Sequence, residues 1–501
     1  MYERTGLSWH LPVLAVVGAA VGHAPGLVIG PSLDAAVFGL VGRLVTDGMV
    51  PYLDVWDHKP PLTYVTEAAA ALGGSAQWPL IWLLSVAATA WVALLASVAL
   101  RQILTPTTSA VLTFGAALLG GQYLLSLGGG LTEPLAAALA ATAFVLALRA
   151  AQLSQWVLIG CVLGLALLAS PQVAPAGPSV LLITLMRTER RVRNVAALLA
   201  GVAAIAATLV VALVAVGALD ASIDAVLVFN AAYRNASDQA LSPWGLVPWT
   251  VLALLPLIAL AVIGMGRLRA VPEAKVPAAG AVVWIAGAIA AWAFQERFYA
   301  HYAIAVVFPF AALAGVGLHD IGAGLAASRG KLVGAAAVAV LVISVPVAVV
   351  GAFQEARSWA VMNERSAAVA AAVSARTRPG DSIFVWGNAP WVYDLADRAP
   401  ASRFIYLLPL VTPGYARPSL IATVVEGLAK RLPTVVVATE SQDAVVGFPT
   451  LDSDLGHSGS DALRALQPLQ SYIHGHYRRA ATVDGWSVLV RISDAEGAST
   501  P

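Results

Sequence analysis

Residues 30–76 hold many side chains that can do chemistry. This concentration is unusual because the segment lies between two strongly apolar segments. Carboxylates and imidazoles accept or donate protons, and an ammonium group stabilises a developing negative charge. Several ionisable residues of this kind occur within 26 positions of one another, and solubility alone does not explain them. The group comprises Asp34, Asp47, Asp54, Asp57, His58 and Lys59.

The pattern around these residues predicts two helices joined by a rigid turn. Ser32 is placed to cap a helix whose first turn contains Asp34, where a carboxylate suits the helix dipole. The helix ends near Gly48, and its amphipathic character predicts that it lies along the membrane surface. Pro60 and Pro61 then enforce an extended turn before a second helix. Apolar residues at helical spacing are Val37, Phe38, Val41, Leu44 and Val45.

A structural and a functional interpretation compete for each charge in this segment. Asp47 is best interpreted as a solvated side chain. Asp34, Asp57 and Lys59 favour function, because they adjoin the helix start and the proline turn. His58 stays open between a hydrogen-bonded loop residue and a ligand, since no HxxH or HExxH pattern accompanies it.

Composition places the whole chain in a membrane. It has 501 residues, of which 59% are hydrophobic and 11% charged, and its mean hydropathy is +0.79. Soluble domains carry about 25% charged residues. The net charge of +1 gives no footprint for nucleic acid, and the single cysteine, Cys161, excludes an intramolecular disulfide or a cysteine-based metal cluster.

Windows of roughly 20 apolar residues predict about eleven transmembrane helices. The fifth and sixth are short and interrupted by Pro171, Pro175 and Pro178, which suits broken helices inside the bundle. The first span lacks a convincing cleavage site for a signal peptide. The predicted spans are 11–29, 77–99, 108–126, 132–149, 154–170, 172–186, 195–218, 245–265, 277–294, 302–320 and 331–353.

Lys and Arg are distributed unequally between the two sets of loops. With the N-terminus inside the cell, the outside loops before the tail hold only Arg43, Lys59, Arg234 and Arg297, whereas the inside loops hold the majority. The positive-inside rule therefore predicts a multi-pass protein of the cytoplasmic membrane with its N-terminus inside and its tail outside. The inside set is Arg101, Arg149, Arg187, Arg190, Arg191, Arg193, Arg267, Arg269, Lys275, Arg329 and Lys331.

The predicted domains are a membrane domain, residues 1–353, and an extracytoplasmic α/β domain, residues 354–501. Strand and helix patterns alternate in the tail, which predicts a mostly parallel sheet. We expect this domain to act as a lid or acceptor-recognition module, because it has no GxGxxG and no P-loop. The expected strands are 382–387, 403–406 and 434–439, and the expected helices are 362–377, 391–397, 418–431 and 460–475.

Further polar residues are predicted on the outer side. Glu133 starts the fourth span, where it either faces a pocket or satisfies the helix dipole. Tyr299, His301 and Tyr302 suit either stacking on a sugar or anchoring at the membrane interface. A polar outer loop contains Asn230, Tyr233, Arg234, Asn235 and Asp238.

Three segments resemble the GT-C glycosyltransferases, and most closely the bacterial relatives of protein O-mannosyltransferase and aminoarabinose transferase. Two are FQERFYAHY, at 294–302 and followed by Pro309, and the tail segment 379–406. Many relatives have Asp-Glu at the first-loop helix start, whereas here Ala35 follows Asp34, which puts a second carboxylate role in doubt. The first-loop match comprises Gly48, Pro51, Tyr52, Asp54, Trp56, Asp57, His58, Lys59, Pro60, Pro61 and Leu62.

This resemblance implies a GT-C-like fold and an inverting transfer of a sugar from a polyprenyl-phosphate donor to an acceptor outside the membrane. It implies Asp34 as the general base, and Lys59 and Arg297 as groups that bind the donor phosphate. A divalent metal bound by Asp34, Asp57, His58 and Glu133 stays open, as do the sugar and a protein, lipid or glycan acceptor. The expected pocket contains Tyr52, Asp54, Trp56, Asp57, His58, Glu133, Tyr299, His301 and Tyr302.

Two other classes of protein compete with the enzyme. A lipid flippase or secondary transporter places ionisable residues at the bilayer midplane and has repeated halves. Here the charges gather at one face, and the spans show no repeat. A structural or assembly protein with an outer binding domain would not need Lys59 beside two prolines and several acids.

Overall fold

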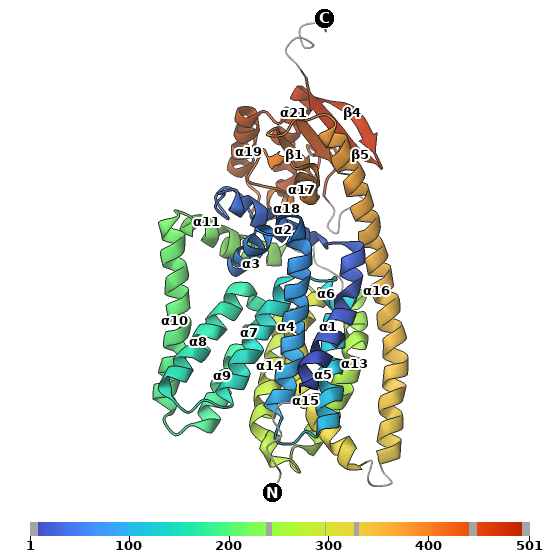
Figure 1. The fold of residues 1–501 in the computed structure, drawn as a ribbon. Helices are drawn as coiled ribbons and strands as arrows, with labels where there is room; N and C mark the ends of the chain where they lie inside the picture. The colour runs from blue at the N-terminus through green and yellow to red at the C-terminus, as the bar shows by residue number, and fades with distance from the viewer. Residues whose placement is uncertain (1–8, 237–242, 296, 325–329, 440–447, 493–501) are drawn as a thin grey trace, which may run out of the picture.

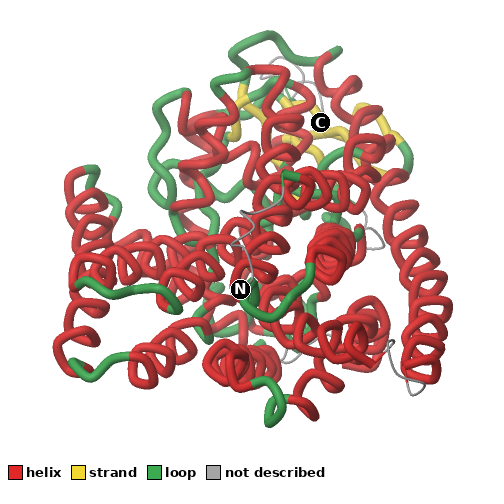
Figure 2. The backbone as a smooth tube through the Cα atoms, turned by 60° about the horizontal axis from the view of Figure 1, so that its bottom comes forward, coloured by secondary structure: helices red, strands yellow, loops and turns green. Residues whose placement is uncertain are grey.

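The computed structural model describes residues 9–236, 243–295, 297–324, 330–439 and 448–492. A bundle of helices carries a small α/β domain on one end, and the two short helices α2 and α3 lie between them (Figure 1). The strands gather in that domain, and the remainder of the described chain is almost entirely helical (Figure 2).

Every predicted span coincides with a helix of the bundle. Among the described residues, six helices are long and apolar enough to cross a membrane. The chain is therefore a multi-pass membrane protein. The bundle consists of α1 (His10–Ile29), α4 (Gln77–Ala99), α5 (Pro106–Gly121), α6 (Tyr123–Ser126), α7 (Thr132–Ala147), α8 (Leu153–Ala169), α9 (Ala176–Arg187), α10 (Arg191–Ala215), α13 (Pro243–Arg267), α14 (Lys275–Gln295), α15 (Ile304–Gly324) and the first part of α16 (Gly330–Ser374).

The three prolines of the short fifth and sixth spans separate two helices rather than breaking one. Pro171 begins a 3-10 turn after α8, Pro175 immediately precedes α9, and Pro178 is in the first turn of α9. Proline fits a first turn, because its missing N–H would have no partner there. The chain thus reverses between α8 and α9 within a few residues.

The first loop forms the two predicted helices, and the apolar face of the first one packs against protein. In α2 (Leu33–Thr46), the Ser32 hydroxyl accepts a hydrogen bond from the Ala35 N–H, as expected of an N-cap. The apolar side chains Phe38 and Val41 are buried in one core with the C-terminal domain. That domain supplies the apolar surface which the sequence pattern had assigned to the membrane. The loop continues into α3 (Leu62–Ala71).

The sheet of the C-terminal domain has the order β2-β1-β3-β5-β4 and is mixed rather than mostly parallel. β1 pairs in parallel with β2 and β3, whereas β5 runs antiparallel to both β3 and β4. β4 and β5 form a hairpin through Asp484 and Gly485, whose φ angles of 47° and 89° suit a two-residue turn. The strands are β1 (Ser382–Trp386), β2 (Ala399–Pro400), β3 (Val435–Ala438), β4 (Tyr477–Val483) and β5 (Trp486–Arg491).

The prediction of a strand at 403–406 is wrong. Only Phe404 makes a β-bridge there, and it pairs with Trp56 of the first loop instead of with the sheet. The Trp56 N–H donates to the Arg403 carbonyl at 2.7 Å, so this segment joins the domain to the loop.

Helices surround the sheet, and most of them match the predicted ranges. The expected helix 460–475 is divided into two, and α16 continues without a break past residue 354, where the domain boundary was expected. The helices are α17 (Trp391–Ala396), α18 (Leu408–Val411), α19 (Pro418–Arg431), α20 (Asp461–Ala465) and α21 (Gln467–His476).

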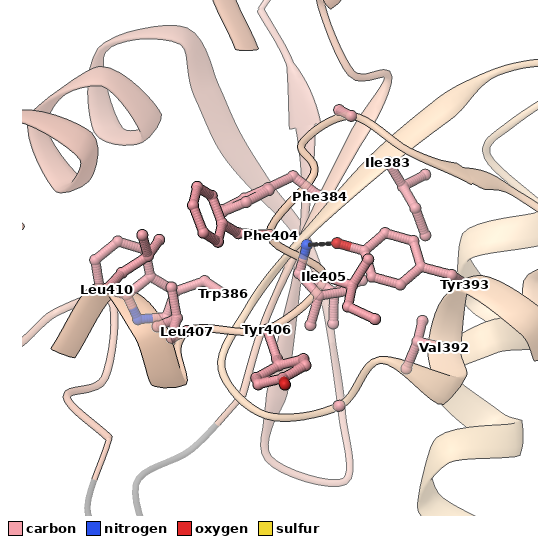
Figure 3. Close-up of a cluster of buried hydrophobic side chains, with 14 of the residues drawn as sticks. Ile383, Phe384, Trp386, Val392, Tyr393, Phe404, Ile405, Tyr406, Leu407 and Leu410 are labelled. Atoms are coloured by element: carbon pink, nitrogen blue, oxygen red, sulfur yellow. Dashed lines mark hydrogen bonds between the residues drawn. The ribbon is translucent and has the colours of Figure 1, made fainter. Parts of the chain in front are cut away.

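The domain core lies between the sheet and the first loop. Inside it, the Tyr393 hydroxyl accepts a hydrogen bond from the Val385 N–H at 2.9 Å (Figure 3). Tyr406 is at the edge of this cluster, with its hydroxyl directed away from the other labelled side chains (Figure 3). That direction matters, because the hydroxyl reaches the first loop.

Candidate active site

A chain of tyrosines holds the turn that carries Lys59. The Tyr52 hydroxyl donates to the Lys59 carbonyl at 2.9 Å, and the Lys59 N–H donates to the Tyr64 hydroxyl at 3.1 Å. Tyr64 in turn donates to Asp57 at 2.8 Å. Tyr52 adopts a positive φ of 70°, an uncommon conformation for a bulky residue that this network maintains. The backbone of Lys59 is therefore fixed from both sides.

Asp57 is the point at which the C-terminal domain meets this turn. Its carboxylate is 2% exposed and accepts hydrogen bonds from Tyr64 and Tyr406, which are far apart in sequence. His58 Nδ1 lies 3.3 Å from the same carboxylate. Burial opposes the charge, but His58, Tyr406 and Tyr64 together lower the pKa of Asp57 to about 2. Asp57 is thus a charged acceptor near neutral pH, and it positions its neighbours.

The side chain of Lys59 extends from the fixed turn towards three acidic residues. Its Nζ lies 5.6 Å from the centre of the Phe38 ring, one helical turn after Asp34 on α2. Burial disfavours its charge, yet Tyr302 and the carboxylates of Asp34, Glu133 and Asp57 raise the pKa of Lys59 above its usual value. We call Asp34, Lys59, Glu133 and Tyr302 the Lys59 cluster.

Asp34 and Glu133 approach the cluster from the first turns of two different helices. Asp34 is half-buried in the first turn of α2, and Glu133 is 2% exposed in the first turn of α7. Both carboxylates therefore lie at the N-terminal ends of helices. Ser170 donates to Glu133 at 3.3 Å and so engages one of its oxygens. Asp34 retains contact with solvent, as a group that meets an acceptor must.

The aromatic residues before α15 line up beside this cluster. His301 stacks on Tyr299 with ring centres 5.3 Å apart, and Tyr302 meets the His301 ring edge-on at 4.7 Å. The Tyr299 hydroxyl is 2.8 Å from that of Tyr233. His301 is 7% exposed, so its ring is embedded in protein rather than anchored at a membrane interface. Tyr299, His301 and Tyr302 therefore lie together as one aromatic group, and Tyr302 interacts electrostatically with Lys59.

Arg297 lies one layer farther from the cluster. Its guanidinium donates to the backbone carbonyls of Tyr233 and Ala236 and lies 4.1 Å from the Tyr233 ring centre. Asn230 donates to the His58 carbonyl at 3.1 Å, which links the same polar loop to the first loop. Asp238 falls outside the described residues.

Two predicted pocket residues are placed elsewhere. Trp56 is 1% exposed and packs among Phe229, Phe404 and Tyr406, where it belongs to the core shared with the C-terminal domain. Asp54 is exposed, and its carboxylate accepts a hydrogen bond from the Val50 N–H at 2.8 Å. Asp54 therefore closes a turn on the surface.

The four residues considered as metal ligands do not gather around one point. Asp57 pairs with His58, whereas Asp34 and Glu133 interact electrostatically with the Lys59 ammonium. Within the part of the chain that the structure describes, three or more His, Cys, Asp or Glu side chains nowhere come together in a way that would hold a metal ion. The site is organised around a lysine cation.

Two tyrosines of the site, Tyr64 and Tyr406, were not among the predicted site residues. Tyr64 had a local signal, since it follows the Pro60-Pro61 turn by one helical turn and can reach back to Asp57. Tyr406 had none, because its partner lies 349 residues away.

Neither a protein-family model nor a curated protein matches this chain. Solved structures do: the aminoarabinose transferase ArnT from Cupriavidus metallidurans matches in its apo state, with a TM-score of 0.52, 14% identity and coverage of 98% of this chain and 97% of that one. The same protein bound to undecaprenyl phosphate matches with a TM-score of 0.50, 16% identity and 97% coverage of both chains. The chain therefore shares the overall fold of ArnT. A weaker likeness, with a TM-score of 0.49 and 14% identity over 96% of this chain and 81% of that one, links it to the apo oligosaccharyltransferase of Archaeoglobus fulgidus.

Proposed function

We propose that this protein is an inverting glycosyltransferase that moves a hexosyl or pentosyl group from a polyprenyl-phosphate donor to an acceptor at the outer face of the cytoplasmic membrane. The observation that carries the proposal is the Lys59 cluster, where one cation and two helix-start carboxylates interact electrostatically at the end of the bundle beside the C-terminal domain. The fold shared with ArnT supports the same reaction class, since the ArnT structure holds undecaprenyl phosphate.

The chemistry is a single displacement at the anomeric carbon. Asp34 accepts the proton of an acceptor hydroxyl while the hydroxyl oxygen attacks that carbon. The bond from the anomeric carbon to the phosphate oxygen breaks, and its electron pair leaves on the phosphate. The charged Lys59 ammonium stabilises this added negative charge. Attack opposite to the departing phosphate inverts the anomeric configuration.

The neighbouring residues suit this division of labour. Glu133 and Asp57 keep Lys59 charged, and the tyrosine network holds its backbone in place. The adjoining aromatic rings of Tyr299 and Tyr302 provide a face for the transferred sugar. Arg297 positions the 233–236 segment through its backbone bonds and lends positive charge to the phosphate side of the site.

Exchange of one carboxylate tests the proposal. Purified protein in lipid nanodiscs is given undecaprenyl-phosphate donors carrying labelled mannose or an arabinose-type sugar, and release of undecaprenyl phosphate is measured. Asp34→Asn should lower turnover about 10²–10⁴-fold. The matched control is Asp47→Asn at the exposed other end of α2, which should keep full turnover. Near-normal turnover by Asp34→Asn would falsify the assignment of the base.

A polyprenyl-lipid flippase or transporter remains the alternative class, and the same preparation separates it from the enzyme. A flippase moves the intact labelled donor between leaflets of a vesicle and leaves its sugar–phosphate bond whole. A glycosyltransferase breaks that bond. Release of free undecaprenyl phosphate supports the enzyme, whereas movement of uncleaved donor alone contradicts it.

A further inference from the structure

A cavity of about 560 Å³ lies on the face of α2 that points away from Asp34. Its wall on α2 includes Ala36 and Arg43, which lie roughly 180–200° around the helix from Asp34 at 3.6 residues per turn. The other walls come from the end of α1, from α3, from the start of α4, and from α16 and α17. The cavity therefore lies between the first loop and the C-terminal domain, and α2 separates it from the Lys59 cluster.

The charges around this cavity do not suit a phosphate. Arg43 is the one basic residue among its lining residues, all of which are in the described part of the chain. Its guanidinium is 2.6 Å from Asp394 and 3.6 Å from Asp397, so two carboxylates neutralise it. Glu67 adds a third acidic side chain. An anionic ligand would meet an excess of acid here, in contrast to the cationic Lys59.

The remaining polar groups suit hydroxyl groups. Glu67 is 4% exposed, and burial raises its pKa to about 8, so near neutral pH it carries a proton that it can donate. The amides of Gln77 and Asn363 also line the cavity. Acids, amides and paired carboxylates together donate to and accept from hydroxyls without carrying a free positive charge.

Indole side chains complete the wall. Trp78 and Trp391 line the cavity, and each directs its ring N–H to a protein acceptor: Trp78 to the Gly26 carbonyl and Trp391 to the Ser366 hydroxyl. With their N–H groups engaged, the rings present apolar surface to the cavity. Sugars combine apolar C–H faces with a rim of hydroxyls, and a mostly apolar cavity with a few placed polar groups fits that combination.

We propose that this cavity is a second saccharide-binding site, which takes an uncharged mono- or disaccharide unit that does not react. The role of this site in catalysis rests on the proposed function. The bound unit would be the non-reacting sugar of a glycan acceptor and would lie against α2. The reacting hydroxyl, on another sugar of the same acceptor, would reach Asp34 around the start of the helix. Gly30 and Pro31, which precede α2, line the cavity and leave that route short.

Saturation-transfer NMR on the full chain in nanodiscs tests the site. The nanodiscs contain no glycolipid or glycoside detergent, whose head groups would compete, and the probes are a panel of neutral hexose and pentose disaccharides, with hexose phosphates for comparison. Wild-type protein should transfer saturation to at least one neutral disaccharide and to none of the hexose phosphates. The proposal is overturned if no neutral disaccharide gives a saturation-transfer signal, or if hexose phosphates give an equal signal.

Two kinds of variant locate the signal. Ala36→Phe fills the cavity and should abolish the disaccharide signal, whereas the matched Ala206→Phe, on an exposed position of α10, should keep it. The double variant Asp394→Asn with Asp397→Asn leaves the cavity open and removes both carboxylates that pair with Arg43. It should therefore give a saturation-transfer signal with hexose phosphates. An unchanged disaccharide signal in folded Ala36→Phe, or no gain by the double variant, contradicts the assignment.

The same measurement keeps this site separate from the transfer reaction. Asp34→Asn protein should bind the disaccharide as wild type does, because Asp34 is on the opposite face of α2. Loss of transfer with retained binding tests the Lys59 cluster alone. Transfer without any saccharide binding removes the second site and leaves the proposed enzyme intact.

Discussion

Lys59 keeps its charge in a half-buried place because acidic residues surround it on several sides. If that charge stabilises the departing phosphate, Lys59→Met, which keeps much of the stem and removes the ammonium, should lower turnover about 10²–10³-fold. Lys430→Met, on the exposed side of α19, removes the same charge elsewhere and should have no effect. Release of undecaprenyl phosphate measures both variants, and equal turnover would exclude Lys59 from catalysis.

Asp57 works through its neighbours rather than on a substrate. Asp57→Asn loses an acceptor of charge-assisted bonds and should lower the free energy of unfolding by about 1.5–3 kcal/mol. Because folding lowers its pKa from 3.8 to about 2, the carboxylate stabilises the protein fully above 3.8 and loses this effect as the pH falls towards 2.

The gap in melting temperature between wild type and Asp57→Asn should therefore shrink as the pH falls from about 4 towards 2. Thermal unfolding followed by intrinsic fluorescence measures it. Asp54→Asn, in the exposed turn of the same loop, is the matched control and should change stability little. A gap that widened towards low pH would contradict the placement of the charged Asp57 in this network.

At the scale of elements, α2 and α3 hold the site because they pack closely enough to exclude a side chain. A Cβ added at Gly42 of α2 would lie 2.5 Å from the Glu67 Cβ and 2.8 Å from the Ala68 nitrogen. Gly42→Ala should push α3 away, cost about 1–3 kcal/mol and displace Tyr64 with it, so both melting temperature and turnover fall.

Gly115→Ala is the matched control for that variant, because it lies inside α5 and an added Cβ there meets nothing within 4 Å. It should be neutral or stabilising by up to about 1 kcal/mol, as alanine favours the helix. If both alanines behaved alike, the close approach of α2 and α3 would not be what positions Tyr64.

Elements with local causes could be predicted from the sequence. Apolar length predicted the helices of the bundle, and Ser32 predicted the start of α2. The residues around Lys59 pointed to the candidate site. The hairpin of β4 and β5 also had a local signal, since Asp484-Gly485 is a preferred two-residue turn between β-branched and aromatic residues, and it was overlooked.

What could not be predicted depends on contacts between distant segments. Phe404 and Tyr406 have the pattern of a strand, but Trp56 and Asp57 draw them to the first loop. Likewise, the apolar face of α2 has the pattern of a membrane-surface helix, and only the folded C-terminal domain shows what covers Phe38. Local pattern states that a face is apolar and does not state which partner buries it.

For the whole molecule, one core joins the first loop to the C-terminal domain. It contains Phe38 from α2, Trp56 from the loop, Val369 from α16 and Trp386 from β1. The continuous α16 links that core to the bundle (Figure 1). The domain is therefore part of the structure that fixes Lys59, and a movement of the domain would be felt at the site through Asp57 and Tyr406.

The direction of the whole molecule in the membrane decides which substrates reach the site. The excess of Lys and Arg in the loops at the far end of the bundle predicts that the Lys59 cluster and the C-terminal domain face outside. In a Cys161→Ser background, intact cells expressing Gly459→Cys should react with a membrane-impermeant maleimide, since this position is exposed in the C-terminal domain. Gln102→Cys, exposed in the loop between α4 and α5, should react only after the cells are permeabilised. The reverse pattern would turn the cluster towards the cytoplasm and exclude an acceptor at the outer face.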